Sequence, residues 1–143
     1  MRKYRAIRIT VLLILLLGIR TYQFAQSAPA GPGKSAEERR ATAIALVRAI
    51  NTSEAVELQT RGSFAAWETL LSHHAEYIDK CMRQNGIRLG SMPEVLPGWN
   101  LRLNVRQDGK AYDLMLEDVA NKQVPYGAYS NETGMIWDAA PIH

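Results

Sequence analysis

The chain has 143 residues, of which 17 are basic and 14 acidic, giving a formal net charge of +3. Five of the basic residues lie within the first 20 positions and no acidic residue precedes Glu37, so residues 28–143 carry 12 basic and 14 acidic side chains. This balance excludes nucleic-acid binding through overall positive charge. Cys81 is the single cysteine, which excludes an internal disulfide, so stability must come from one packed core.

The first 27 residues have the layout of a secretory signal peptide: a basic start, an apolar run over residues 7–19 and small residues at the exit. The run has 13 positions, whereas a bilayer-spanning helix needs about 20. We expect cleavage between Ser27 and Ala28, which makes the protein periplasmic or secreted. Two alternatives remain: cleavage after Ala30, or an uncleaved segment that tethers the chain to the inner membrane, facing the periplasm.

A flexible linker at residues 28–34 and a single domain at residues 35–143 follow, because Gly-Pro-Gly at positions 31–33 breaks regular structure. Ser35 and Glu38 match a capping box, which predicts the start of a helix over residues 36–58. Gly62 is expected to end it as a left-handed cap. The spacing predicts one buried stripe on this helix, made of Ile44, Val47, Ala55 and Leu58, with Ala43 and Ile50 on its flank.

Asn51 falls in the middle of that stripe. It is either a buried polar group that needs partners, or the cap of a second helix after a break. We favour one continuous helix with a local irregularity. A second helix is predicted over residues 64–82, where Trp67, Leu70, Leu71, Ile78 and Cys81 or Met82 recur at helical spacing. Residues 89–98 contain two prolines and two glycines and are expected to form a loop.

Apolar and polar residues then alternate over residues 99–105 and 112–117, which predicts two half-buried strands joined by a turn at residues 107–110. This alternation places Asp113 and Glu117 on the solvent face. Shorter strands are expected at residues 126–129 and 135–137. The predicted fold class is α+β: a long N-terminal helix and a second helix packed on a small four-stranded antiparallel sheet.

Residues 49–57 (Ala-Ile-Asn-Thr-Ser-Glu-Ala-Val-Glu), followed by Gly-Ser-Phe at 62–64, are similar to the helix and post-helix region of type IV pilin-like and pseudopilin-like proteins. Residues 126–136 (Tyr-Gly-Ala-Tyr-Ser-Asn-Glu-Thr-Gly-Met-Ile) resemble the end of their sheet. The resemblance implies a pilin-like headgroup, a structural subunit without enzymatic activity. The prepilin processing pattern is absent, since Gly18 ends the apolar run and no acidic residue precedes Glu37. The chain therefore resembles a headgroup without the retained filament helix.

His73 and His74, with Glu76 and Asp79, are the only candidates for metal or acid–base chemistry. They lack the His-Glu-x-x-His pattern of zinc hydrolases and a convincing third ligand. A helix surface is therefore expected here, with no catalytic, metal or cofactor-binding residue and no cofactor.

The expected function is that of an exported, non-catalytic structural or interaction protein of the bacterial envelope, related to type IV pilus and pseudopilin subunits. Its expected partners are envelope proteins or further copies of itself, no nucleic acid, and the membrane only if the N-terminal segment is retained. The alternative is a small periplasmic or secreted ligand-binding domain, with a pocket lined by Trp99, Tyr112, Tyr129 or Trp137. Of the three tryptophans, Trp67, Trp99 and Trp137, at least two are expected to be core residues. An enzyme that uses His73 and His74 is the third hypothesis.

Overall fold

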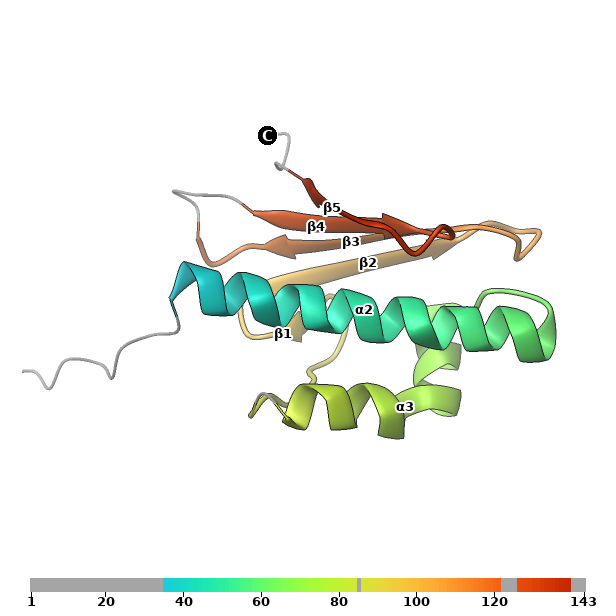
Figure 1. Cartoon of the computed structure of the whole chain (residues 1–143), viewed down its shortest axis with the longest axis horizontal. Helices are drawn as coiled ribbons and strands as arrows, with labels where there is room; N and C mark the ends of the chain where they lie inside the picture. Colours follow the sequence, from blue (N-terminus) through green and yellow to red (C-terminus); the bar gives the residue numbers. More distant parts are fainter. Residues whose placement is uncertain (1–34, 85, 122–125, 140–143) are drawn as a thin grey trace, which may run out of the picture. The chain divides into compact units, whose positions relative to one another are not determined.

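The computed structural model describes residues 35–84, 86–121 and 126–139. The expected signal peptide, its cleavage between Ser27 and Ala28 and the linker at 28–34 lie outside these ranges. The described residues form two helices and a five-stranded antiparallel sheet, labelled as in Figure 1. The elements are α2 (Ala36–Arg61), α3 (Trp67–Arg83), β1 (Glu94–Leu96), β2 (Trp99–Val105), β3 (Tyr112–Asp118), β4 (Gly127–Asn131) and β5 (Ile136–Ala139).

The fold class is α+β, as predicted, but the sheet has five strands and not four. The strand order β1-β2-β3-β4-β5 makes it an antiparallel meander. The missed strand is β1, which lies in the segment expected to be a loop. It has only three residues and pairs with β2 through a register shift between Glu94 and Leu96. Such a short strand next to prolines leaves no alternation for a sequence pattern to detect.

Both ends of α2 are set by the residues that the sequence indicates. The Ser35 hydroxyl accepts a hydrogen bond from the Glu38 N–H, and the Glu38 carboxylate accepts one from the Ser35 N–H, which completes the capping box. Gly62 has a φ of 79°, and its N–H donates to the Leu58 carbonyl. The helix therefore continues three residues beyond the predicted end at 58, and both caps are confirmed.

The buried face of α2 differs from the predicted stripe. Val47 is buried, but Ile44 is only half-buried, and Ala55 and Leu58 are exposed. The predicted stripe is wrong in the second half of the helix because three polar residues occupy the buried face there. The buried residues of α2 are Ala43, Leu46, Val47, Ala49, Ile50, Ser53, Glu54 and Glu57.

Asn51 is part of one continuous helix, as favoured from the sequence. Its amide nitrogen donates to Ser130 Oγ at 2.8 Å and to the Gly134 carbonyl at 3.1 Å. Its amide oxygen accepts a hydrogen bond of 2.9 Å from the Tyr112 hydroxyl. The polar atoms of Asn51 therefore join α2 to β3 and to the β4–β5 hairpin. These hydrogen bonds satisfy a polar side chain that lies on the packed side of the helix.

The second helix begins at Trp67, three residues later than predicted. The backbone of the preceding residues is used elsewhere: the Phe64 N–H donates to the Gly109 carbonyl, and the Ala65 N–H donates to a carboxylate oxygen of Glu54. The predicted face of α3 is confirmed. Its buried residues are Trp67, Leu70, Ile78 and Met82, with Leu71 and Cys81 partly buried.

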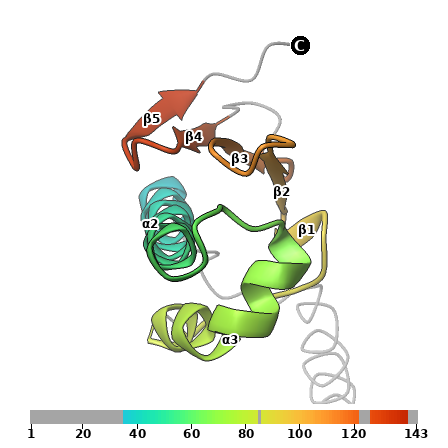
Figure 2. The same cartoon turned by 90° about the vertical axis from the view of Figure 1, so that its right-hand side faces the viewer.

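The helices lie in layers on the sheet. Figure 1 shows α2 running alongside the strands, and Figure 2 shows it nearly end-on, between the sheet and α3. Its sheet side contacts β3, β4 and β5, and its other side contacts α3. Leu101, Leu114 and Leu116 have no exposed surface and form the sheet's part of the core. Burying each such side chain stabilises the fold by about 1.5–3 kcal/mol. Because α2 contacts both the sheet and α3, it contributes to two packed interfaces.

The opposite face of the sheet carries the polar residues that alternation predicts. Asp113 is exposed and Glu117 half-buried, which confirms their placement on the solvent side. Met115 pairs with Tyr129, and Tyr129 pairs with Trp137, across β3, β4 and β5. The rings of Tyr129 and Trp137 lie 5.5 Å apart, and the Tyr129 hydroxyl donates to Asp113.

Candidate functional site

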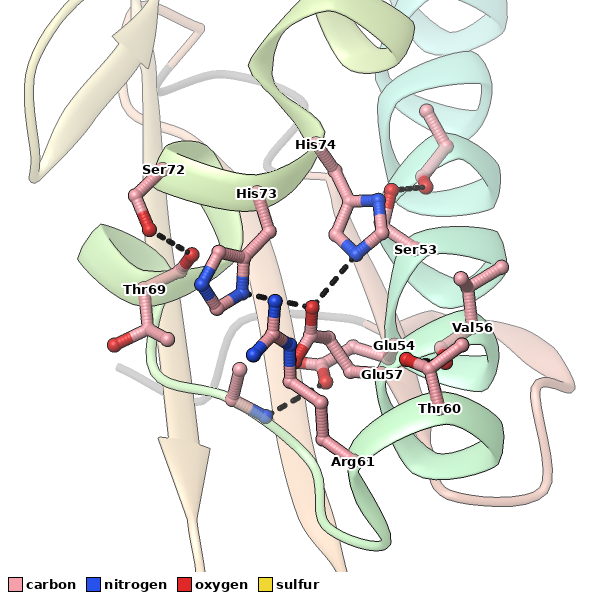
Figure 3. A network of polar contacts seen from close by, with 12 residues as sticks. Ser53, Glu54, Val56, Glu57, Thr60, Arg61, Thr69, Ser72, His73 and His74 are labelled. Atoms are coloured by element: carbon pink, nitrogen blue, oxygen red, sulfur yellow. Dashed lines mark hydrogen bonds and ion pairs between the residues drawn. The ribbon is translucent and has the colours of Figure 1, made fainter.

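A network of buried carboxylates and histidines joins α2 to α3 (Figure 3). His73 Nδ1 and His74 Nε2 each lie 2.8 Å from the same oxygen, Oε1 of Glu57. The other oxygen of Glu57 lies 3.2 Å from Arg61 Nε, one helical turn further along α2. The two histidines are neighbours on α3, and Glu57 reaches them because it lies on the face of α2 that packs against that helix.

The Glu57 carboxylate is stabilised in its charged form. Burial alone would raise its pKa, but hydrogen bonds from His74 and His73, with the nearby charges of His73 and Arg61, lower the pKa below its ordinary value. The side chain of Glu57 is 3% exposed, whereas those of His73 and His74 are 28% and 17% exposed. The two histidines therefore cover the carboxylate from solvent.

Glu54 lies one turn before Glu57 and has no exposed surface. Its Oε2 accepts a hydrogen bond of 2.9 Å from the Ala65 N–H in the α2–α3 linker. Within the described part of the chain, its Oε1 has no hydrogen-bond partner. Burial raises the pKa of Glu54 to about 7, the Ala65 N–H opposes this, and the charge of Glu57 adds to it. Glu54 is therefore a group that titrates near neutral pH.

This network is built to hold elements together. Neither carboxylate is open to a substrate in solution, because Glu54 is fully buried and the side chain of Glu57 is 3% exposed. The network instead connects α2, the linker and α3 through charge-assisted hydrogen bonds, which are stronger than neutral ones.

The predicted grouping of His73 and His74 with Glu76 and Asp79 is not formed. Asp79 pairs with Arg83 one turn further along α3, and Glu76 lies on the exposed side of that helix. No group of three or more His, Cys, Asp or Glu side chains in residues 35–84, 86–121 and 126–139 is arranged to hold a metal ion. The partner of the two histidines is Glu57 from the other helix, which sequence spacing missed.

A second feature is a hollow of about 560 Å³ beside Trp99. It lies where the first half of α2, the segment after α3 and the β1–β2 turn come together. Its lining includes two arginines and four apolar side chains. The described residues around it are Arg39, Thr42, Gly86, Ile87, Arg88, Leu96, Pro97 and Trp99.

The wall of this hollow next to Trp99 is rigidly held. Arg39 Nη2 lies 2.6 Å from Asp118 Oδ1, and Arg39 Nε donates to Asp118 Oδ2 at 3.2 Å, so the pair is bidentate. The guanidinium carbon of Arg39 lies 5.5 Å from the centre of the Trp99 ring, within the range of a cation–π contact. On its other side, Trp99 packs edge-on against Tyr126 at 5.9 Å.

The aromatic residues that were expected to line a ligand pocket do not line a common surface. Trp99 lines the hollow, whereas Tyr112 is buried in the core and Tyr129 and Trp137 lie on the opposite sheet face. Trp67 and Trp99 are 4% and 3% exposed, which confirms that at least two tryptophans are core residues. The two arginines that line the hollow, Arg39 and Arg88, lie 49 positions apart in the sequence, so no local pattern connects them.

The described helices include none that is long and apolar enough to cross a bilayer. Comparison of the chain with models of known protein families, with curated proteins and with solved structures finds no match.

Proposed function

We propose that the chain is an exported, non-catalytic, pilin-like structural or interaction protein of the bacterial envelope. The observation that carries the proposal is the contact made by Asn51. This residue lies in the first of the two segments that resemble pilins, and its side chain bonds to Ser130 and Gly134 in the second. The two segments that resemble pilins lie about 80 positions apart in the sequence and are joined by a hydrogen bond at the helix–sheet interface.

The arrangement of α2 supports the same proposal. A helix of 26 residues begins directly after the predicted linker and lies along an antiparallel meander. The buried Glu57 carboxylate pairs with His73 and His74, whose side chains are 28% and 17% exposed, and this pairing joins α2 to α3. The pairing favours a structural over an enzymatic role for the histidines. An exported domain without the filament helix would act at the envelope through contacts with other proteins or with further copies of itself.

The export step has a direct test. A signal peptidase reads small residues at the last position before the cut and two positions earlier, here Ser27 and Ala25. Mass spectrometry of the natural protein is expected to give a chain beginning at Ala28. Ser27→Arg should retain the N-terminal segment, whereas the matched variant Gln26→Arg, at the intervening position, should be processed normally. Detection of intact Met1 in the natural protein would contradict cleavage and favour the tethered form.

The interaction role is tested by chemical cross-linking in intact cells, followed by affinity purification from envelope fractions and by electron microscopy of the purified protein. Specific envelope partners or ordered self-assemblies are the expected result. A protein that stays monomeric at high concentration and cross-links to no envelope component would rule the role out.

Small-ligand binding is a second candidate function, favoured by the hollow beside Trp99. Its volume is within the range of about 300–1,000 Å³ typical of small-molecule pockets. A ligand that shifts the NMR signal of the Trp99 indole N–H at micromolar concentration would support this function. No response to any member of a diverse fragment set would exclude it.

A further inference from the structure

The charge of the hollow beside Trp99 is positive. Its described lining contains Arg39 and Arg88 and no acidic side chain. Arg39 is already neutralised, because Asp118 binds it bidentately from outside the hollow. Arg88 is exposed, and none of the ion pairs found among the described residues includes it. Among the described residues that line the hollow, Arg88 is therefore the cation available to a ligand.

The remaining wall is mainly apolar. Leu96 and Trp99 are 2% and 3% exposed, so they form a fixed floor with little free surface, and Ile87 and Pro97 supply more of the exposed apolar lining. Ile87 is half-buried and follows α3, and Pro97 lies in the β1–β2 turn. An apolar ligand body placed against this floor would be removed from water and stabilised by about 25 cal/mol per Å² of buried apolar area.

We propose that this hollow binds an amphipathic carboxylate, an aliphatic or aromatic acid with an apolar body of roughly ten carbon atoms in the size range of such pockets. The carboxylate pairs with Arg88, and the apolar body lies against Ile87, Leu96 and Trp99. Arg39 does not pair with the ligand, since Asp118 holds its guanidinium against the Trp99 ring. This inference rests on the second candidate function and names its ligand class.

The arrangement selects against other ligand classes. A cationic amphiphile would place its charge beside Arg88, which is repulsive. A neutral amphiphile would gain the apolar contact but leave Arg88 with water as its partner. A free inorganic anion would pair with Arg88 but would leave the apolar floor uncovered. An acid with an apolar body is the class that uses both features.

The test compares two probes with the same number of carbon atoms and different head groups, the anionic decanoate and the neutral decanol, by isothermal titration against the exported protein. Decanoate is expected to bind more tightly, and its affinity should fall with added salt because exposed charges are screened. Arg88→Gln should weaken decanoate by up to about fivefold, the upper end for an exposed ion pair, and leave decanol unchanged. Arg48→Gln, an exposed arginine on α2 outside the hollow, is the matched control and should change neither.

A variant of the apolar wall locates the site. Ile87→Ala should weaken decanoate and decanol together, with circular dichroism checking that the variant is folded. Equal binding of both probes, with no effect of Arg88→Gln, would overturn the carboxylate class and leave small-ligand binding in place. Failure of both probes to bind would overturn the inference but not the second candidate function, which the fragment set tests separately. Loss of decanoate binding in Arg48→Gln would place the anion elsewhere and also overturn the inference.

Discussion

At the scale of single residues, Glu54 is the most unusual group in the fold. It is a carboxyl group with no exposed surface, and among the described residues it is hydrogen-bonded to the Ala65 N–H alone. Its neighbour Glu57 is equally buried but is paired with His73, His74 and Arg61. Burial of a charge without a cation is costly, so Glu54 lowers that cost by binding a proton, whereas Glu57 stays ionised. Two carboxylates one turn apart thus differ in charge because their partners differ.

The first prediction concerns the pH dependence that Glu54 gives the fold. Its folded-state pKa of about 7 lies above the ordinary value of 4.5. The stabilisation from its protonated form is therefore complete below pH 4.5 and is lost as the pH rises to about 7. Glu54→Gln keeps an acceptor for the Ala65 N–H and cannot ionise. The free energy of unfolding of the variant, relative to the natural protein, should increase by about 3 kcal/mol between pH 4.5 and pH 8.

Urea denaturation at several pH values measures this difference, from which contributions common to both proteins cancel. Glu76→Gln, an exposed carboxylate on α3, is the control and should show no such pH dependence. A difference for Glu54→Gln that stays constant with pH would show that folding does not raise the pKa of Glu54.

At the scale of elements, the α2–α3 linker and the β2–β3 turn support one another. The Phe64 N–H donates to the Gly109 carbonyl at 2.9 Å, and Lys110 Nζ donates to the Gly62 carbonyl at 2.6 Å. Gly109 has a φ of 65°, and a Cβ atom at this position would lie 2.8 Å from Ser63 Cβ. The turn therefore requires glycine for its backbone conformation and also for its contact with the linker.

The second prediction separates these two requirements. Gly109→Ala should destabilise the fold by about 1–2 kcal/mol from the left-handed backbone and by about 1–3 kcal/mol more from the contact with Ser63. Gly134→Ala is the matched control, since Gly134 has a φ of 72° with nothing within 4 Å of the added Cβ. It should show the backbone cost alone.

Removal of the opposing side chain completes the test. Ser63→Gly in the Gly109→Ala background should recover the contact cost and leave the backbone cost, as thermal or urea unfolding would show. Equal destabilisation in Gly109→Ala and Gly134→Ala, with no recovery on Ser63→Gly, would mean that the linker and the turn do not pack as described.

At the scale of the whole described domain, α2 lies between the sheet and α3 (Figure 2). Arg39 and Arg40 join its first turns to Asp118 at the end of β3 and to Asp138 in β5. Asn51 joins its centre to the sheet, and Glu57 joins its last turns to α3. Unfolding α2 would therefore remove both helix–sheet and helix–helix packing.

Much of this architecture follows from sequence patterns that repeat. The strict alternation from Trp99 to Val105 and the capping box at Ser35 are local signals, and both are confirmed because local geometry alone produces them. The contacts of Glu54, Glu57 and Asp118 were not predictable in the same way. A charged residue in a helix usually indicates a solvated face, and only the packing of a second element makes it buried. The hollow was also missed, because Arg39 and Arg88 are distant in the sequence and line one hollow only in the folded chain.

The last prediction follows from the central position of α2. Native-state hydrogen exchange should find the slowest amides in residues 46–53, where buried Leu46 and Ile50 contact the core on the helix's inner face. These amides should exchange only through global unfolding, with a free energy equal to that from urea denaturation. The strand β5 lies at the edge of the sheet, and its Trp137 is 39% exposed. Its amides should exchange through local opening, with a clearly lower free energy of opening that depends little on urea concentration. The α3 amides should fall between the two, because that helix packs mainly against α2. If residues 46–53 exchanged as fast as β5, α2 would not be the structural centre of the domain, and the two helices and the sheet would have to unfold independently.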